Sequence, residues 1–227
     1  MISRRVLLAS AGALALGACS ARAEPAVAPA PPVPLRLSTR WSARPDGPLP
    51  ATGDEGAPLQ CVLSGSTERP AIRGGALVSN LPDAHSAAYL SQPLGQRLRR
   101  IGATFGFRPG DVAGSVALLA WTGSMPLSGH CHMVFTSDRW IAGVLVDGAV
   151  QEVDTAYYAR PLVQDVRPYR VDLTFDGATV IADLPDGTRR TMTDPRFDRG
   201  DGVAACWEFY KNDAGSADSM LYETWAG

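Results

Sequence analysis

Hydrophobic and polar residues alternate with a period of two along much of the chain. The clearest example is YRVDLTFD at residues 169–176, where apolar side chains at the odd positions alternate with polar ones at the even positions. Because successive side chains of a β-strand point to opposite faces, this pattern predicts a half-buried strand. Asp-Gly pairs at residues 147–148, 176–177 and 186–187 favour the tight turns of hairpins. The chain is therefore expected to form a run of antiparallel hairpins.

Other segments have the length and composition of strands but a weaker alternation. They comprise residues 59–63, 75–80, 100–107, 115–121, 130–136, 140–146, 149–154, 178–184, 203–210 and 219–225. Only residues 94–101 have a pattern that allows a short helix. Because no long helical pattern and no repeat of fixed period is found, residues 37–227 predict one all-β domain, a sandwich of two antiparallel sheets.

The first residues have the zones of an export signal. A basic pair at residues 4–5 precedes an apolar run at residues 6–16, and small residues follow. At about 1.5 Å per residue, this run is too short to cross a hydrocarbon core about 30 Å thick. We therefore expect residues 1–18 to be a signal peptide rather than a membrane-spanning helix.

The end of this signal predicts how the protein is attached to the cell. LGAC at residues 16–19 resembles the bacterial lipobox, which implies a lipid on Cys19 and a membrane as partner; the alternative is a plain secretory signal cleaved nearby. SRRVLL at residues 3–8 also resembles a twin-arginine signal, with the general secretory route as its alternative. Residues 19–36 are rich in Ala and Pro and predict an extended tether. We expect an exported protein anchored at the cell envelope, on the outer face of the cytoplasmic membrane or in the periplasm, or else a secreted one.

Composition and charge exclude two classes of protein. Hydrophobic residues make up 45% of the 227 residues, enough to bury a core, so the chain is not disordered throughout. Lys and Arg number 21 and Asp and Glu 23, which gives a formal net charge of -2. Because no basic stretch accumulates that could neutralise a row of phosphates, we expect no nucleic acid partner.

Several short motifs resemble those of concanavalin A-like, laminin G-like jelly-roll domains. They are DGPL at residues 46–49, TGD at 52–54, GGAL at 74–77, IGATF at 101–105, PYRV at 168–171, LPDG at 184–187 and ACWE at 205–208. The resemblance covers about residues 37–226. It implies two sheets of curved strands, and a concave face that in such domains often holds carbohydrate.

The segment His130-Cys131-His132 carries the most conspicuous chemistry. Residues two apart on a strand share a face, so His130 and His132 could approach one ligand together. A metal site would need a third ligand, which the neighbouring sequence does not supply, so we expect neither a metal nor another cofactor. The pair is interpreted as a structural or ligand-contacting one.

Other candidate ligand contacts lie on predicted strands. Glu208 stands in an apolar segment and shares a strand face with Tyr210, and a carboxylate there must be paired, exposed or functional. Pairing with an arginine is the alternative to ligand contact. Trp140 and Tyr157 are candidate platforms on which a sugar ring could stack, with packing in the core as their alternative.

Three cysteines remain once Cys19 is assigned to the lipid. They are Cys61, Cys131 and Cys206, an odd number for an exported protein. Cys131 and Cys206 both lie in central predicted strands, so we expect this pair to form a disulfide, although spacing alone leaves the connectivity open.

Three functions are compatible with these features. The first is an envelope lipoprotein or secreted module that binds a glycan or another envelope component, which makes the domain a binding module rather than an enzyme. The second is a glycan-cleaving hydrolase or lyase of the same fold, with a site drawn from His130, His132, Glu208 and Tyr210. The third is a protein-interaction module without a small ligand, which should present a broad apolar patch.

Overall fold

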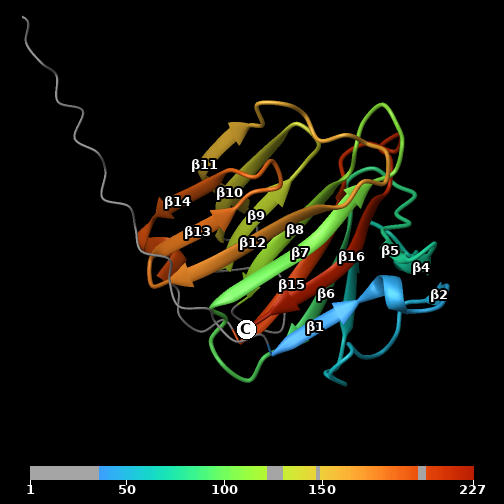
Figure 1. Ribbon diagram of the computed structural model, residues 1–227, viewed down its shortest axis with the longest axis horizontal. Coiled ribbons are helices and arrows are strands. Elements are labelled where there is room, and N and C mark those ends of the chain that lie inside the picture. The colour runs from blue at the N-terminus through green and yellow to red at the C-terminus, as the bar shows by residue number, and fades with distance from the viewer. Residues whose placement is uncertain (1–35, 122–129, 147–148, 199–202) are drawn as a thin grey trace, which may run out of the picture. The chain divides into compact units, whose positions relative to one another are not determined.

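The folded part of the chain is a sandwich of two antiparallel sheets (Figure 1). The computed structural model describes residues 36–121, 130–146, 149–198 and 203–227. The expected signal peptide, the lipidation site Cys19 and the tether lie outside the described residues. The prediction of an all-β, two-sheet sandwich is confirmed.

The nine-stranded sheet lies toward the viewer in Figure 1. Its order is β14 (Arg189–Thr193), β13 (Thr179–Asp183), β12 (Tyr169–Asp176), β7 (Arg100–Phe107), β16 (Ser219–Ala226), β5 (Ala76–Val78), β4 (Ala71–Arg73) and β2 (Gly47–Pro48). β1 (Leu37–Arg40) pairs with β16 off this path.

The seven-stranded sheet lies behind it. Its order is β11 (Ala149–Tyr157), β10 (Arg139–Val146), β9 (His130–Phe135), β8 (Ser115–Trp121), β15 (Ala204–Lys211), β6 (Ser86–Pro93) and β3 (Gln60–Ser64). Two short 3₁₀ turns, η1 (Trp41–Ala43) and η2 (Pro195–Asp198), complete the regular structure of the described residues. No helix in this part of the chain is long and apolar enough to span a membrane.

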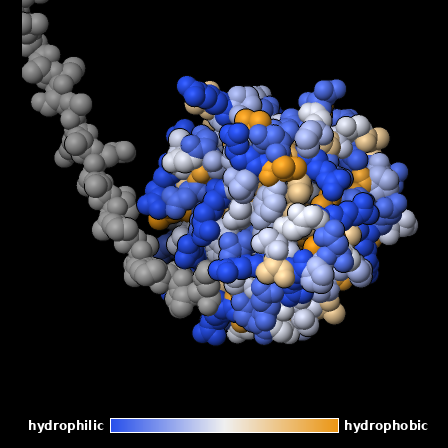
Figure 2. All heavy atoms as spheres, turned by 45° about the vertical axis from the view of Figure 1, so that its right-hand side comes forward, coloured by the Kyte–Doolittle hydropathy of each residue, from blue (hydrophilic) through white to orange (hydrophobic). Residues whose placement is uncertain are grey.

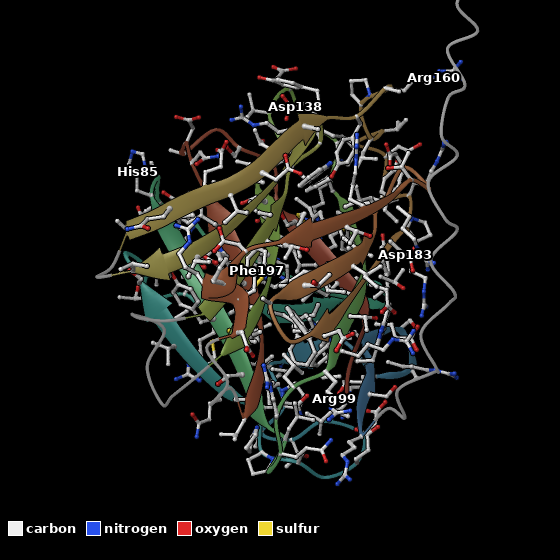
Figure 3. The ribbon with its side chains drawn as sticks, turned by 90° about the vertical axis from the view of Figure 1, so that its left-hand side faces the viewer. His85, Arg99, Asp138, Arg160, Asp183 and Phe197 are labelled. Carbon is white, nitrogen blue, oxygen red and sulfur yellow. The ribbon has the colours of Figure 1, made fainter. Side chains whose placement is uncertain are left out.

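The core fills the space between the two sheets. Alternate residues of each strand point inward, as Phe105 and Leu173 do from one sheet and Leu118 and Trp207 from the other. The indole Nε1 of Trp207 donates a hydrogen bond of 3.0 Å to the carbonyl oxygen of Gly102, which ties the sheets together. Phe197 of η2 is buried between the sheets at one edge, where η2 contacts β13 and β9 (Figure 3).

Gly102 of β7 is also covered on the outer side of its sheet. Trp225 lies opposite it on β16 and is only 1% exposed, although it does not face the core. The Arg170 guanidinium stacks 3.9 Å above the Trp225 ring, and the indole Nε1 donates to Asp172 Oδ2 at 2.9 Å. Asp172 in turn accepts two hydrogen bonds from Arg100, at 2.8 and 2.7 Å. The ring is therefore held by Arg170 above it and by Asp172 at its Nε1, and it lies opposite Gly102.

Most predicted strands match the observed ones, and the differences have physical causes. The segments predicted at 100–107, 115–121 and 169–176 coincide with β7, β8 and β12. The helix allowed at 94–101 is absent: residues 94–99 have no regular structure, and β7 begins at Arg100. The apolar positions that suggested a helix are buried there by packing against other strands, since Leu98 and Ile101 both belong to the core.

The expected disulfide between Cys131 and Cys206 is corrected by the structure. All three cysteines of the described residues, Cys61, Cys131 and Cys206, are free thiols. Cys131 packs in the core between the sheets, whereas Cys206 belongs to a small apolar cluster on the outer face of the seven-stranded sheet. Because the two side chains point to opposite faces, no disulfide can join them without moving the strands.

Burial should make these thiols unreactive in the folded protein. Desolvation raises the pKa of Cys131 to about 12 and raises those of Cys206 and Cys61 as well. With iodoacetamide at neutral pH, we expect no labelling of Cys131 or Cys206 and slow labelling of the half-buried Cys61, because only the thiolate reacts. Mass spectrometry should show all three labelled in urea without reductant. A Cys131 that stays unlabelled in urea would contradict the free-thiol assignment.

Candidate functional site on the seven-stranded sheet

Two residues far apart in sequence meet on the outer face of the seven-stranded sheet. His132 lies on β9 and Glu208 on β15, and β8 runs between these strands. The register places Ala117 of β8 opposite Glu208. Because alanine is small, the two longer side chains reach over β8, and His132 Nε2 lies 2.9 Å from Glu208 Oε2. Both side chains are largely buried, with 12% of His132 and 5% of Glu208 exposed.

A third residue completes a hydrogen-bonded set around this carboxylate. Tyr89 of β6 lies directly opposite Glu208 in the register, and its hydroxyl hydrogen-bonds to the carboxylate. Burial and the adjacent Glu208 charge raise the pKa of Tyr89 well above its usual range, so the phenol stays protonated and donates. The ionised carboxylate can only accept, so Nε2 of His132 carries a hydrogen. Glu208 thus avoids the cost of burying an unpaired charge.

Two further polar side chains adjoin this set. Tyr210 is two residues beyond Glu208 on β15 and shares its face, and its hydroxyl lies 3.4 Å from His85 Nδ1. Tyr210 also acts electrostatically on Tyr89, which places the two phenols near each other. His85 precedes β6 and is exposed, on the seven-stranded side of the molecule in Figure 3. We refer to His132, Glu208, Tyr89, Tyr210 and His85 as the Glu208 cluster.

The structure separates Trp140 from this cluster and leaves the His130 side chain undescribed. Trp140 is 2% exposed and packs in the core, so it offers no face on which a ligand could stack. His130 belongs to β9, but its side chain lies outside the described residues. The arginine expected as an alternative partner of Glu208 is replaced by His132 and Tyr89.

Tyr157 lies on the same sheet face but at its far edge. It is 69% exposed on β11, where Arg139 stacks 5.7 Å from its ring and donates a hydrogen bond of 3.3 Å to its hydroxyl. Three strands separate β11 from β15, which at about 4.8 Å per strand is about 19 Å. Only an extended ligand could contact both Tyr157 and the Glu208 cluster.

Sequence reasoning missed Tyr89 and His85. Tyr89 lies in β6, which was not among the predicted strands, and it is the single aromatic residue of that strand. β6 pairs with β15, a strand far from it in the sequence, and such a pairing cannot be deduced from local turns or spacing, so the position of Tyr89 opposite Glu208 could not be predicted. Within the described residues, no three His, Cys, Asp or Glu side chains lie close enough together to hold a metal ion.

The comparisons with known proteins support the fold class. No protein-family model and no curated protein sequence matches the chain. The carbohydrate-binding module CBM66 from Bacillus subtilis superposes with a TM-score of 0.51 at 11% identity, covering 71% of this chain and 91% of that one. The exoplasmic/lumenal domain of VIP36 in its Ca²⁺/mannose-bound form gives 0.54 at 12% identity, covering 85% and 91%.

A third structure, the carbohydrate recognition domain of Emp47p, gives a TM-score of 0.55 at 9% identity, covering 84% of this chain and 94% of that one. The chain therefore has the concanavalin A-like lectin fold, as its sequence motifs suggested. At these identities the likeness defines the fold and leaves the ligand to be argued from the site.

Proposed function

We propose that this domain binds a carbohydrate on the outer face of the seven-stranded sheet, through the Glu208 cluster. The observation that carries the proposal is the hydrogen-bonded set of His132, Glu208 and Tyr89 on an outer sheet face. The fold adds support by analogy, since the structures that share it are described as carbohydrate-binding.

The chemistry of the cluster suits a sugar. Sugar hydroxyls both donate and accept hydrogen bonds, and a carboxylate has about four acceptor positions, of which His132 and Tyr89 use two in Glu208. Because Glu208 is only 5% exposed, the remaining positions can accept only from a ligand hydroxyl that enters between the neighbouring side chains of the cluster. Tyr210 adds an aromatic ring and a hydroxyl beside the carboxylate, and an aromatic ring packs well against the C–H face of a sugar.

A glycan array tests this proposal directly. The purified full chain should bind a subset of glycans and leave them intact, since the cluster is assembled to hold hydroxyl groups. Bound material should be eluted and its chain length measured by mass spectrometry. If no glycan on a broad array is bound, the proposal is contradicted.

A glycan-cleaving activity is the second candidate function. It is favoured by the contact between His132 and Glu208, because an imidazole and a carboxylate 2.9 Å apart can exchange a proton. The Glu208 cluster contains one carboxylate, whereas retaining hydrolysis requires two about 5 Å apart. Binding is therefore better supported than cleavage. Shortened glycans eluted from the same array would instead favour cleavage.

The distribution of exposed hydrophobic side chains gives less support to a protein-interaction module than the Glu208 cluster gives to carbohydrate binding. The exposed large hydrophobic side chains of the described residues are Val112, Val150, Tyr157, Val163, Val166 and Val203. Val150 and Tyr157 lie at opposite ends of β11, Val163 and Val166 lie in the loop before β12, and Val112 and Val203 lie in other loops. The face drawn in Figure 2 is mainly hydrophilic, with small scattered hydrophobic areas. A broad apolar patch is not seen on that face.

The sequence also leads us to propose that the protein is an exported lipoprotein. In this proposal a lipid on Cys19 anchors the chain, and residues 19–36 hold the domain away from the membrane. Cys19→Ala should move the protein from the detergent phase to the aqueous phase in a Triton X-114 partition. Cys61→Ala is the matched control and should stay with the detergent. A Cys19→Ala variant that also stays there would refute the anchor.

A further inference from the structure

A recess opens on the nine-stranded sheet, away from the Glu208 cluster. Its volume is about 610 Å³, within the range of ligand pockets. Its walls come from the ends of β4 and β7 and from the loop before β12, and its floor comes from β16. In Figure 1 these strands belong to the right-hand part of the nine-stranded sheet, where β7, β16, β5 and β4 follow one another. We call it the Arg73–Arg108 pocket after its two charged residues.

The two arginines of the pocket have no ionic partner among the residues that the structure describes. Neither the Arg73 nor the Arg108 side chain makes a hydrogen bond or an ion pair with another described residue. This contrasts with Arg100, Arg189 and Arg196, each of which is held by an aspartate. A pocket with two uncompensated guanidinium groups attracts an anion, and a guanidinium is shaped to bind a carboxylate through two hydrogen bonds.

The acidic residues nearby are engaged elsewhere. Burial and the charge of Asp165 raise the pKa of Tyr222. The Asp165 carboxylate forms an ion pair with Arg167 at 3.2 Å. Asp218 accepts a hydrogen bond from the Ser79 hydroxyl at 2.9 Å. Asp46 accepts one of 2.8 Å from the backbone N–H of Gly74, at the pocket rim. None of these three aspartates forms an ion pair with Arg73 or Arg108, so the hydrogen-bond donors of the two guanidinium groups are left for a ligand.

The floor of the pocket is apolar. Met220 and Tyr222 line it, and Met220 packs with Ala76 and Val78 in a small apolar cluster outside the main core. An inorganic ion would gain nothing from such a floor, whereas an organic anion could bury its carbon skeleton against it. This combination selects a ligand with an acidic group and an apolar or ring-shaped body.

One wall of the pocket is held in an unfavourable backbone conformation. Val166 has φ of +62°, which a β-branched residue rarely adopts. Its N–H donates to the Phe107 carbonyl at 3.0 Å, and its own carbonyl accepts a hydrogen bond from the Tyr222 hydroxyl. Strained residues that are fixed by their surroundings occur preferentially at ligand sites. Here the contacts keep the wall and the floor in a fixed relation.

We propose that the Arg73–Arg108 pocket binds an organic carboxylate, with the acid group at the two arginines and its body against Met220 and Tyr222. This site is independent of the proposed glycan site, since the two lie on different sheets. A sugar acid and an aromatic acid share this chemistry, and the test distinguishes them.

The test follows the methyl group of Met220 by NMR in full-length protein labelled with [¹³C-methyl]methionine. Sodium phenylacetate and sodium glucuronate are titrated separately. We expect at least one of them to shift the Met220 signal saturably, while the signals of Met133 and Met192, which lie in the core, stay unchanged. Tighter binding of phenylacetate would indicate an aromatic acid as the ligand, and tighter binding of glucuronate would indicate a sugar acid.

The variants Arg73→Gln and Arg108→Gln should each weaken binding about tenfold, as expected for loss of a charge-assisted hydrogen bond. Arg160→Gln is the control, because Arg160 is exposed outside the pocket (Figure 3). Unchanged Met133 and Met192 signals report that each variant is folded. The proposal fails if neither acid shifts Met220, if methyl phenylacetate or sodium sulfate shifts it equally well, or if the arginine variants bind like the control.

Discussion

Replacing Gly102 with alanine is expected to lower the free energy of unfolding by about 3 kcal/mol, the upper end of the usual cost of overpacking. A Cβ atom at this position would lie 2.3 Å from the ring of Trp225. The ring cannot yield easily, because Arg170 stacks above it and Asp172 holds its Nε1. For a domain of this size, such a loss corresponds to a fall in Tm of about 9 °C. Thermal unfolding followed by circular dichroism measures it.

Gly47→Ala is the matched control for this substitution. Its new Cβ would meet nothing within 4 Å, so we expect a change within about 0.5 kcal/mol. The double variant Gly102→Ala, Trp225→Leu should be more stable than the sum of the two single effects predicts, because the smaller side chain makes room for the methyl group. Equal melting temperatures for Gly102→Ala and Gly47→Ala would show that Trp225 does not pack on β7.

The second large effect is expected at Glu208, and it depends on the proposed glycan site. Glu208→Gln should weaken binding of the best glycan from the array by about 30-fold, which corresponds to the loss of one charged hydrogen bond of about 2 kcal/mol. The amide keeps the shape of the side chain but loses the charge that His132 and Tyr89 contact. Isothermal titration calorimetry gives the dissociation constants.

Glu152→Gln serves as the control for this loss of charge. Glu152 is exposed on β11 of the same sheet, so its replacement should leave the dissociation constant unchanged. Thermal unfolding of both variants is measured beside the titration, because Glu208 is buried and its replacement also removes a hydrogen-bond acceptor from His132 or Tyr89. Only a loss of binding measured below the melting temperature of Glu208→Gln counts toward the proposal. If Glu208→Gln binds as well as Glu152→Gln, the cluster does not hold the glycan.

The strands β12 and β6 show that a strand is easier to predict from the sequence when its two faces differ in polarity than when both faces are buried. β12 was predicted in full because one of its faces packs in the core with apolar side chains and the other carries polar ones, which produces a clean alternation. β6 was missed because its residues are buried on both faces, and SAAYLSQP therefore shows no period of two. The spacing of residues 94–101 allowed a short helix, and packing within the sandwich overrode it.

Only part of the candidate site could be predicted from the sequence, for a geometric reason. Glu208 was predicted as a candidate ligand contact because it is a carboxylate in an apolar segment, and His132 because it belongs to a histidine pair. Their contact joins residues 76 positions apart and depends on which strand lies between them. Strand order and register are set by the whole sandwich, so neither this contact nor the position of Tyr89 could be read from local pattern.

The hydrogen bond from Trp207 to Gly102 gives the molecule an internal reporter. The indole N–H of Trp207 is buried and belongs to the residue next to Glu208 in β15, yet its acceptor lies in the other sheet. Its exchange with deuterium therefore requires the sheets to part, and the exchange rate measures how often they do. A ligand that settles on β15 should slow that exchange, so a single proton signal would register occupancy of the outer face from within the core.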